Sequence, residues 1–181
     1  GDVYKRQHKL SATFTSGKMK MMYPIIGTFS KDLVNLVDEL SSNEEGIDIK
    51  NVCTRFTADV IGSCGFGLEC NALKDENTEM LKMASFFDIR DLRTRANFFF
   101  VSVFPKIAKK FKMRITPDFI NEFFMRVIKQ TYDYRLNNEV NRTDFMSLLL
   151  QIQKYGKLKD DETETVGTLT FNEIAAQAFV C

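Results

Sequence analysis

The C-terminal end of the sequence constrains the fold more than any other part of the chain. Thr170 and Glu173 have the Thr-x-x-Glu spacing of a capping box at a helix start. Leu169 and Ile174 can form the hydrophobic staple that accompanies such a box. Residues 174–181 are apolar on nearly every face, and a helix of this kind must be buried among other elements. We therefore expect a core helix that the chain ends within.

Periodic apolar residues predict further helices along most of the chain. Three prolines and nine glycines in 181 residues are few for a chain of many turns. Thr116, Pro117 and Asp118 are the types expected of an N-cap, a first helical residue and a first-turn acid. The predicted helices run over about residues 24–40 (opened by Pro24), 52–61, 77–88, 117–135, and 144–154 with Gly156 as its stop. The predicted fold class is mainly α.

Composition and residue types argue against several classes of function. The net charge of +1 gives no reason to expect a nucleic-acid partner. The four cysteines form no Cys-x-x-Cys pair and have no histidine near them, which argues against a zinc site and for reduced thiols. His8 is the only histidine, so no Ser-His-Asp or Cys-His arrangement is expected. Residues 62–67 are glycine-rich but lack the Gly-Lys-Ser/Thr ending of a phosphate-binding loop, and they predict a helix-terminating turn.

An aromatic run followed by a basic run is a candidate contact with a membrane surface. No apolar run is long enough to cross a bilayer, but residues 98–104 contain four phenylalanines, and five cations with no acid among them follow within ten residues. Aromatic side chains next to cations suit a segment that dips into an anionic membrane surface. The alternative is a buried helix end followed by a solvated basic turn. The predicted membrane contacts are Phe98, Phe99, Phe100, Phe104, Lys109, Lys110 and Lys112.

Four stretches of the sequence carry a family resemblance. They are residues 10–20 (Leu-Ser-Ala-Thr-Phe-Thr-Ser-Gly-Lys-Met-Lys), 56–70, 142–148 (Arg-Thr-Asp-Phe-Met-Ser-Leu) and 171–180. In this order they resemble the end of helix C, helix E with the turn after it, the opening of helix H and the entry to helix I of microsomal cytochrome P-450 enzymes. The similarity is greatest to the insect families related to the vertebrate 3A group. It implies the helical part of the cytochrome P-450 fold, from helix C to early helix I, truncated at both ends.

The start of the chain departs from that family. The family's helix C carries a Trp and, four residues later, an Arg that hold the haem propionates. These positions fall on Val3 and Gln7, which do not match, and Ala12 replaces a usual proline. We interpret residues 1–7 as a non-native leader. Residues 8–181 are then a partial cytochrome P-450 domain.

The resemblance also implies a chemistry for the whole protein. It would be a haem-thiolate monooxygenase that uses heme b to insert one oxygen atom from O2 into a small apolar substrate, a xenobiotic or a lipid-like compound. Electrons would come from NADPH through NADPH-cytochrome reductase, at the cytosolic face of the endoplasmic reticulum membrane. The family's oxygen-activation motif and iron-ligating cysteine would lie beyond residue 181. Cys181 falls in the helix I region and is not that ligand, so this chain alone is expected to hold no haem and to be inactive.

Candidate substrate contacts follow from the same resemblance. Ala176 and Val180 match positions on the helix I face over the haem, and residues four apart share one helix face. Phe86, Phe87 and Phe98 fall in the region of helix F, which is another substrate-recognition stretch. The competing interpretation is a non-enzymatic helical domain that binds a lipid or a partner helix, which the Phe- and Met-rich composition also fits. An Ala-Gly-x-Glu-Thr continuation after Cys181 would favour the oxygenase.

Overall fold

The computed structural model describes residues 15–42, 46–86, 92–104, 107, 116–138, 140, 142–156 and 168–180. Within these ranges all regular structure is helical, which confirms the mainly α prediction. The elements are α2 (Ser16–Ser41), α3 (Ile49–Ile61), the π-helical turn η2 (Gly62–Phe66), α4 (Glu79–Phe86), α5 (Leu92–Val103), α7 (Asp118–Asn137), α8 (Phe145–Tyr155) and α9 (Phe171–Val180). In this part of the chain no helix combines the length and apolarity needed to cross a membrane.

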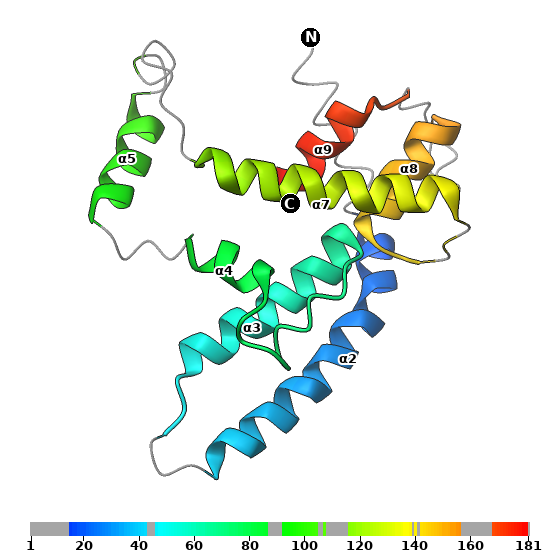
Figure 1. The fold of residues 1–181 in the computed structure, drawn as a ribbon. Coiled ribbons are helices and arrows are strands. Elements are labelled where there is room, and N and C mark those ends of the chain that lie inside the picture. The colour runs from blue at the N-terminus through cyan, green and yellow to red at the C-terminus, as the bar shows by residue number, and fades with distance from the viewer. Residues whose placement is uncertain are drawn as a thin grey trace.

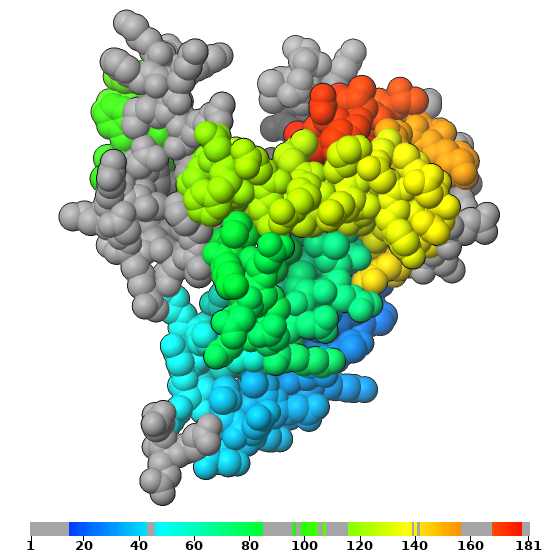
Figure 2. Space-filling model, viewed as in Figure 1, coloured from blue at the N-terminus to red at the C-terminus, as the bar shows by residue number. Residues whose placement is uncertain are grey.

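Two groups of helices, joined by η2, form the body of the molecule (Figure 1). In the first group α2 lies beside α3, and α4 packs against α3. In the second group α9 packs against both α7 and α8. The turn η2 at the end of α3 contacts α8 and thereby connects the groups. In the space-filling view α7 runs across the molecule along the side of the second group that faces α4 (Figure 2), and in the ribbon view α5 stands apart from both groups.

The apolar core lies mainly where α7, α8 and α9 meet. Ile128 of α7, Met146 and Ile152 of α8, and Ile174 of α9 are completely buried. They belong to one cluster that also reaches η2, α3 and α4. Because burying a side chain of this size contributes about 1.5–3 kcal/mol, this junction is a large source of stability for the second group.

The predicted start and stop of α8 and the predicted capping box of α9 are confirmed. The Ser147 N–H donates to Asp144 Oδ1 at 2.9 Å, which caps the start of α8, and Gly156 ends this helix with φ of +70°. At α9 the Thr170 N–H donates to Glu173 Oε2 at 2.9 Å, and the Glu173 N–H donates to Thr170 Oγ1 at 3.3 Å. Both sides of the staple, Leu169 and Ile174, are buried. These caps use side chains within three residues of the helix start, which explains why sequence alone could predict them.

The predicted starts of the first helix and of α7 were wrong. Pro24 was expected to open a helix, but it lies inside α2, which begins at Ser16. Because proline has no N–H, Pro24 cannot donate to the Lys20 carbonyl as a helical residue normally would. Pro24 is exposed, so water can satisfy that carbonyl. Pro117 takes the N-cap position of α7 with an extended ψ of 154°, so the helix begins at Asp118, one residue later than predicted. Pro117 has no side-chain hydrogen bond to cap this start.

The predicted end of the second helix at Ile61 is confirmed, and a π-helical turn follows where a helix-terminating turn was predicted. The backbone continues from α3 through the π-helical turn η2, and it leaves the helical region only at Gly67, where φ is +67°. Glycine adopts this left-handed conformation without steric cost. Gly62 is also required, because a Cβ there would meet Cys70 Sγ. The five residues of η2 therefore lie between the end of α3 and the left-handed Gly67.

Candidate functional site

Helix α9 presents two different faces, and together they define the candidate site. Ile174, Ala175 and Ala178 are buried against the rest of the molecule. Ala176 lies between them in sequence but is exposed. Since successive residues of a helix are about 100° apart, Ala176 and Ala178 face nearly opposite directions. One face of α9 is thus part of the core, and the other is open in the described part of the chain.

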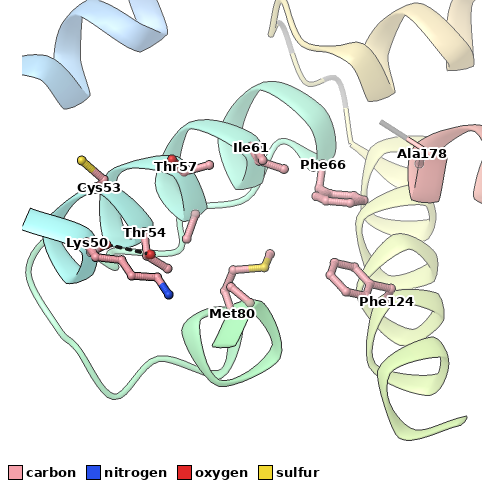
Figure 3. A pocket seen from close by; sticks show the side chains of 11 residues that line it. Lys50, Cys53, Thr54, Thr57, Ile61, Phe66, Met80, Phe124 and Ala178 are labelled. Atoms are coloured by element: carbon pink, nitrogen blue, oxygen red, sulfur yellow. Dashed lines mark hydrogen bonds between the residues drawn. The ribbon is translucent and has the colours of Figure 1, made fainter. Parts of the chain in front are cut away.

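The buried face of α9 contributes to an apolar cleft of about 500 Å³ (Figure 3). The cleft lies between α3, η2, α4, α7 and the end of α9. Its lining residues are Lys50, Cys53, Thr54, Thr57, Ala58, Ile61, Phe66, Met80, Ala84, Phe124 and Ala178. This volume falls within the range of small-molecule sites, roughly 300–1,000 Å³.

The two ends of the cleft differ in polarity. Lys50, Thr54 and Thr57 line one end, on the first turns of α3 (Figure 3). Phe66 and Phe124 face each other at the other end, with ring centroids 5.6 Å apart. This ring pair joins η2 to α7, so the placement of η2 determines the shape of the apolar end.

A hydrogen-bonded network around Asp144 holds η2 in place. Arg135 of α7 donates from Nη1 and Nη2 to the two Asp144 carboxylate oxygens at 2.6 and 2.7 Å. Arg142 donates from Nη2 to Ser63 Oγ at 2.9 Å, and its Nε lies 3.3 Å from Asp144 Oδ2. Gly67 packs so closely over the ion pair that a Cβ there would collide with Arg135 Nη2. The network therefore ties the end of η2 to the start of α8.

A second network fixes the segment that leads to α4. Arg55 of α3 donates to the carbonyls of Ala72 and Leu73 at 2.8 and 2.6 Å. Asp59, one turn later, accepts from the N–H groups of the same two residues at 2.8 Å each. The two N–H groups and two carbonyls of Ala72 and Leu73 are thus all satisfied by one buried Arg and one buried Asp. This clamp sets the path of the chain into α4, whose Met80 lines the cleft.

Two of the described cysteines, Cys64 and Cys70, have raised pKa values. Burial raises the pKa of the Cys70 thiol to about 11, and the Asp59 carboxylate adds to the shift. Burial also raises the pKa of Cys64; Asp144 adds to this, and Arg142 opposes it. Both thiols are therefore protonated near neutral pH in this chain. Within the described residues no three His, Cys, Asp or Glu side chains gather as a metal site.

The structure places the predicted substrate contacts on three separate helices. Ala176 is exposed on α9, and Val180 follows one turn later, with a side chain outside the described part. Phe86 ends α4 and Phe98 lies in α5, also without described side chains. Phe87, Val3, Gln7 and Cys181 lie outside the described residues. The predictions for these side chains, and for residues 1–7 as a leader, therefore stay predictions.

The cleft residues Phe66, Phe124 and Ala178 were missed as site residues by the sequence reasoning. Phe124 and Ala178 carried only the signal of a core stripe, which is the same for a packed interior and for a cleft wall. Phe66 is the one aromatic residue of the glycine-rich segment 62–67, and this isolated ring was the available signal.

The aromatic run of α5 is largely exposed in this chain. Phe99 is 66% exposed, Val103, Phe104 and Ile107 are also exposed, and Phe100 is partly buried. The rings of Phe100 and Phe104 pack at 5.3 Å. The basic residues Lys109, Lys110 and Lys112 lie outside the described part of the chain. An exposed apolar surface of this kind is typical of an interaction site.

Comparison with known proteins supplies the family. The arrangement is that of a helical scaffold around an apolar cleft, and the profile of the family described as Cytochrome P450 matches residues 2–181. The chain therefore belongs to the cytochrome P450 family, and the predicted resemblance is confirmed.

Insect proteins are among its most similar relatives. The chain is 40% identical over 175 residues to "Probable cytochrome P450 6a20" of Drosophila melanogaster, covering 96% of this chain and 34% of the relative. It is 39% identical over 173 residues to "Cytochrome P450 6A1" of Musca domestica, covering 95% and 33%. "Cytochrome P450 6a2" of Drosophila melanogaster is 36% identical over 179 residues, covering 96% and 35%. The chain spans about a third of the length of these relatives.

Proposed function

We propose that the whole protein is a haem-dependent monooxygenase that inserts one oxygen atom from O2 into a small apolar substrate. The family match supports this proposal. Haem bound through a thiolate supplies the activation of oxygen in such enzymes. The iron-ligating cysteine is proposed to lie in a part of the whole protein beyond residue 181, since the chain spans about a third of the length of its relatives. NADPH, acting through NADPH-cytochrome reductase, is the proposed electron source.

The role proposed for this chain is to form one wall of the substrate pocket and the scaffold behind it. The exposure of Ala176, a small apolar residue between the buried Ala175 and Ala178 of α9, is the observation that carries this role. A small apolar side chain on an open face leaves room for a substrate. It is too small to keep any part of the substrate away from that face. The capping box and the packing of Ile174 and Ala178 fix the rotation of α9, which holds that face in one direction.

The experiment compares the whole protein with residues 1–181. The whole protein, read from its transcript and expressed in microsomes with the reductase, should give the red-shifted Soret peak of thiolate-bound haem after reduction and addition of carbon monoxide. It should also consume NADPH in the presence of an apolar substrate. The 181-residue chain mixed with haemin should give neither signal. A whole protein without the peak would favour the competing interpretation, a helical domain that binds a lipid or a partner helix.

We also propose that the exposed face of α5 contacts the cytosolic surface of the endoplasmic reticulum membrane. Phe99, Val103, Phe104 and Ile107 provide the apolar surface, and the following basic run provides attraction to anionic headgroups. Co-sedimentation with phosphatidylserine-containing vesicles should fall severalfold for Phe99→Ser with Phe104→Ser. Tyr134→Ser, which removes an equally exposed aromatic ring from α7, is the control and should leave binding unchanged.

A further inference from the structure

A second hollow, of about 670 Å³, lies between the end of α7 and the outer side of α8, away from the apolar cleft. We name it the α7–α8 basin. The residues that matter for its chemistry are Arg135, Leu136, Arg142, Gln151, Lys154 and Tyr155. Neither the proposed monooxygenase chemistry nor the membrane surface uses any of them.

The basin is cationic. Three of its described lining residues are Arg135, Arg142 and Lys154, and none of the lining residues that the structure describes is a carboxylate. The buried Asp144 beneath it neutralises Arg135. Arg142 is 30% exposed and also lies 3.9 Å from Glu69 at the edge. Lys154 is exposed, with its ammonium 5.3 Å from the centre of the Tyr155 ring. The positive charge available to a partner is therefore centred on Lys154 and the outer part of Arg142.

Two large side chains stand exposed beside these cations. Leu136 is 59% exposed and Tyr155 is 50% exposed. Tyr and Arg are the residue types that contribute most to protein–protein interfaces, with polar groups such as Gln151 at the rim. The combination differs from that of a simple solvated basic patch, which would not present apolar surface beside its charges.

The helix ends around the basin decide between a small anion and a protein segment. Both α7 and α8 end here, and each helix C-terminus carries about half a negative charge. This field weakens the attraction of the basin for a lone small anion. A segment that brings carboxylates to Lys154 and an apolar side chain to Leu136 gains from both contacts at once.

We propose that the α7–α8 basin docks an acidic segment of a partner protein that also carries an aromatic or aliphatic side chain. This inference is independent of the proposed oxygenase chemistry. Complementary charge sets the preference for acidic partners, and Leu136 and Tyr155 provide the apolar contact that holds them.

The test measures binding of two fluorescein-labelled peptides to the chain by fluorescence anisotropy at several salt concentrations. Glu-Glu-Tyr-Glu-Glu should bind at least about fivefold more tightly than Gln-Gln-Tyr-Gln-Gln, and its affinity should fall as salt rises. Lys154→Glu should abolish that preference, whereas Lys31→Glu, on exposed α2, should preserve it. Far-ultraviolet circular dichroism verifies that each variant keeps its helices.

Two further measurements complete the test. Lys-Lys-Tyr-Lys-Lys should bind Lys154→Glu more tightly than it binds the unaltered chain, since the charges are exchanged. Leu136→Ala should lower the affinity for the acidic peptide, and the loss should be about the same at high salt as at low salt. Equal affinity for the acidic and neutral peptides, or equal damage from Lys31→Glu, would overturn the proposal. The proposal would also be overturned if the chain bound phosphatidylserine vesicles through Lys154 and showed no preference between the peptides. That result would assign the basin to a lipid surface.

Discussion

Arg135 and Asp144 form a buried ion pair with two parallel hydrogen bonds that joins the end of α7 to the start of α8. The bonds measure 2.6 and 2.7 Å, and the two side chains are only 4% and 0% exposed. Asp144 also accepts the N–H of Ser147 at 2.9 Å as the cap of α8. The pair is fully satisfied, so its cost of desolvation is offset by contacts that depend on both members being present.

The first prediction is that Asp144→Asn lowers the free energy of unfolding by about 3–5 kcal/mol. The change leaves the Arg135 guanidinium buried without a counter-charge, and an uncompensated buried charge is strongly destabilising. Urea denaturation followed by circular dichroism measures the effect. Asp133→Asn is the control, because Asp133 pairs with Lys129 on the exposed side of α7 at 3.0 Å. This control should cost no more than about 0.5 kcal/mol, and equal losses in the two variants would contradict the assignment.

The second prediction concerns Gly67, which lies against that ion pair. Gly67→Ala should destabilise the protein by about 1–3 kcal/mol, because an alanine at φ of +67° is strained and its Cβ would collide with Arg135 Nη2. Gly27→Ala is the matched change inside α2, where a Cβ would meet nothing within 4 Å. It should instead stabilise the helix by about 1 kcal/mol. Thermal unfolding of both variants should thus shift in opposite directions, and a shift in the same direction would refute the account of Gly67.

The features that the sequence predicts involve residues close together in the chain, whereas the features that were missed involve residues far apart in it. The caps of Asp144 and Thr170 act within three residues, and apolar periodicity identifies a helix from its own residues. The bond between Arg142 and Ser63 spans 79 positions, and no local pattern encodes it. The same holds for the cleft, which five elements build together. The start of α2 was missed because an exposed proline is tolerated in a helix interior when solvent can satisfy the freed carbonyl.

The third prediction is a pH dependence that arises from Cys70. Burial raises the pKa of this thiol from its ordinary value of 9.0 to about 11. Between these two values the unfolded chain releases the proton while the folded chain retains it. The free energy of unfolding should therefore fall as pH rises from about 9 to about 11. Cys70→Ser should remove this part of the slope, and comparing the two proteins at each pH cancels the titration of Lys and Tyr. An identical slope in the two proteins would contradict the raised pKa.

A chemical measurement tests the same thiol independently. At pH 8 the thiolate fraction of Cys70 should be very small, so iodoacetamide should react with it slowly. Cys53 is exposed on α3 and is the internal control. Mass spectrometry of peptides from the folded chain should show Cys53 alkylated well before Cys70. Addition of urea should bring the two rates together, since unfolding removes the burial that protects Cys70.

The final prediction separates the two faces of α9 in the whole monooxygenase, and it rests on the proposed function. Ala176→Phe adds bulk to the open face, and Val180→Phe is predicted to do the same because the two residues are four apart. An apolar pocket discriminates by about 1–3 kcal/mol per methylene-sized change. Product ratios should therefore shift by about tenfold or more. Ala178→Phe enlarges the buried face and should instead cost about 1–3 kcal/mol of stability through overpacking. Product distribution and unfolding of the haem-bound protein distinguish these effects. If Val180→Phe lowers stability and leaves the products unchanged, Val180 packs against a neighbouring helix and does not face the substrate.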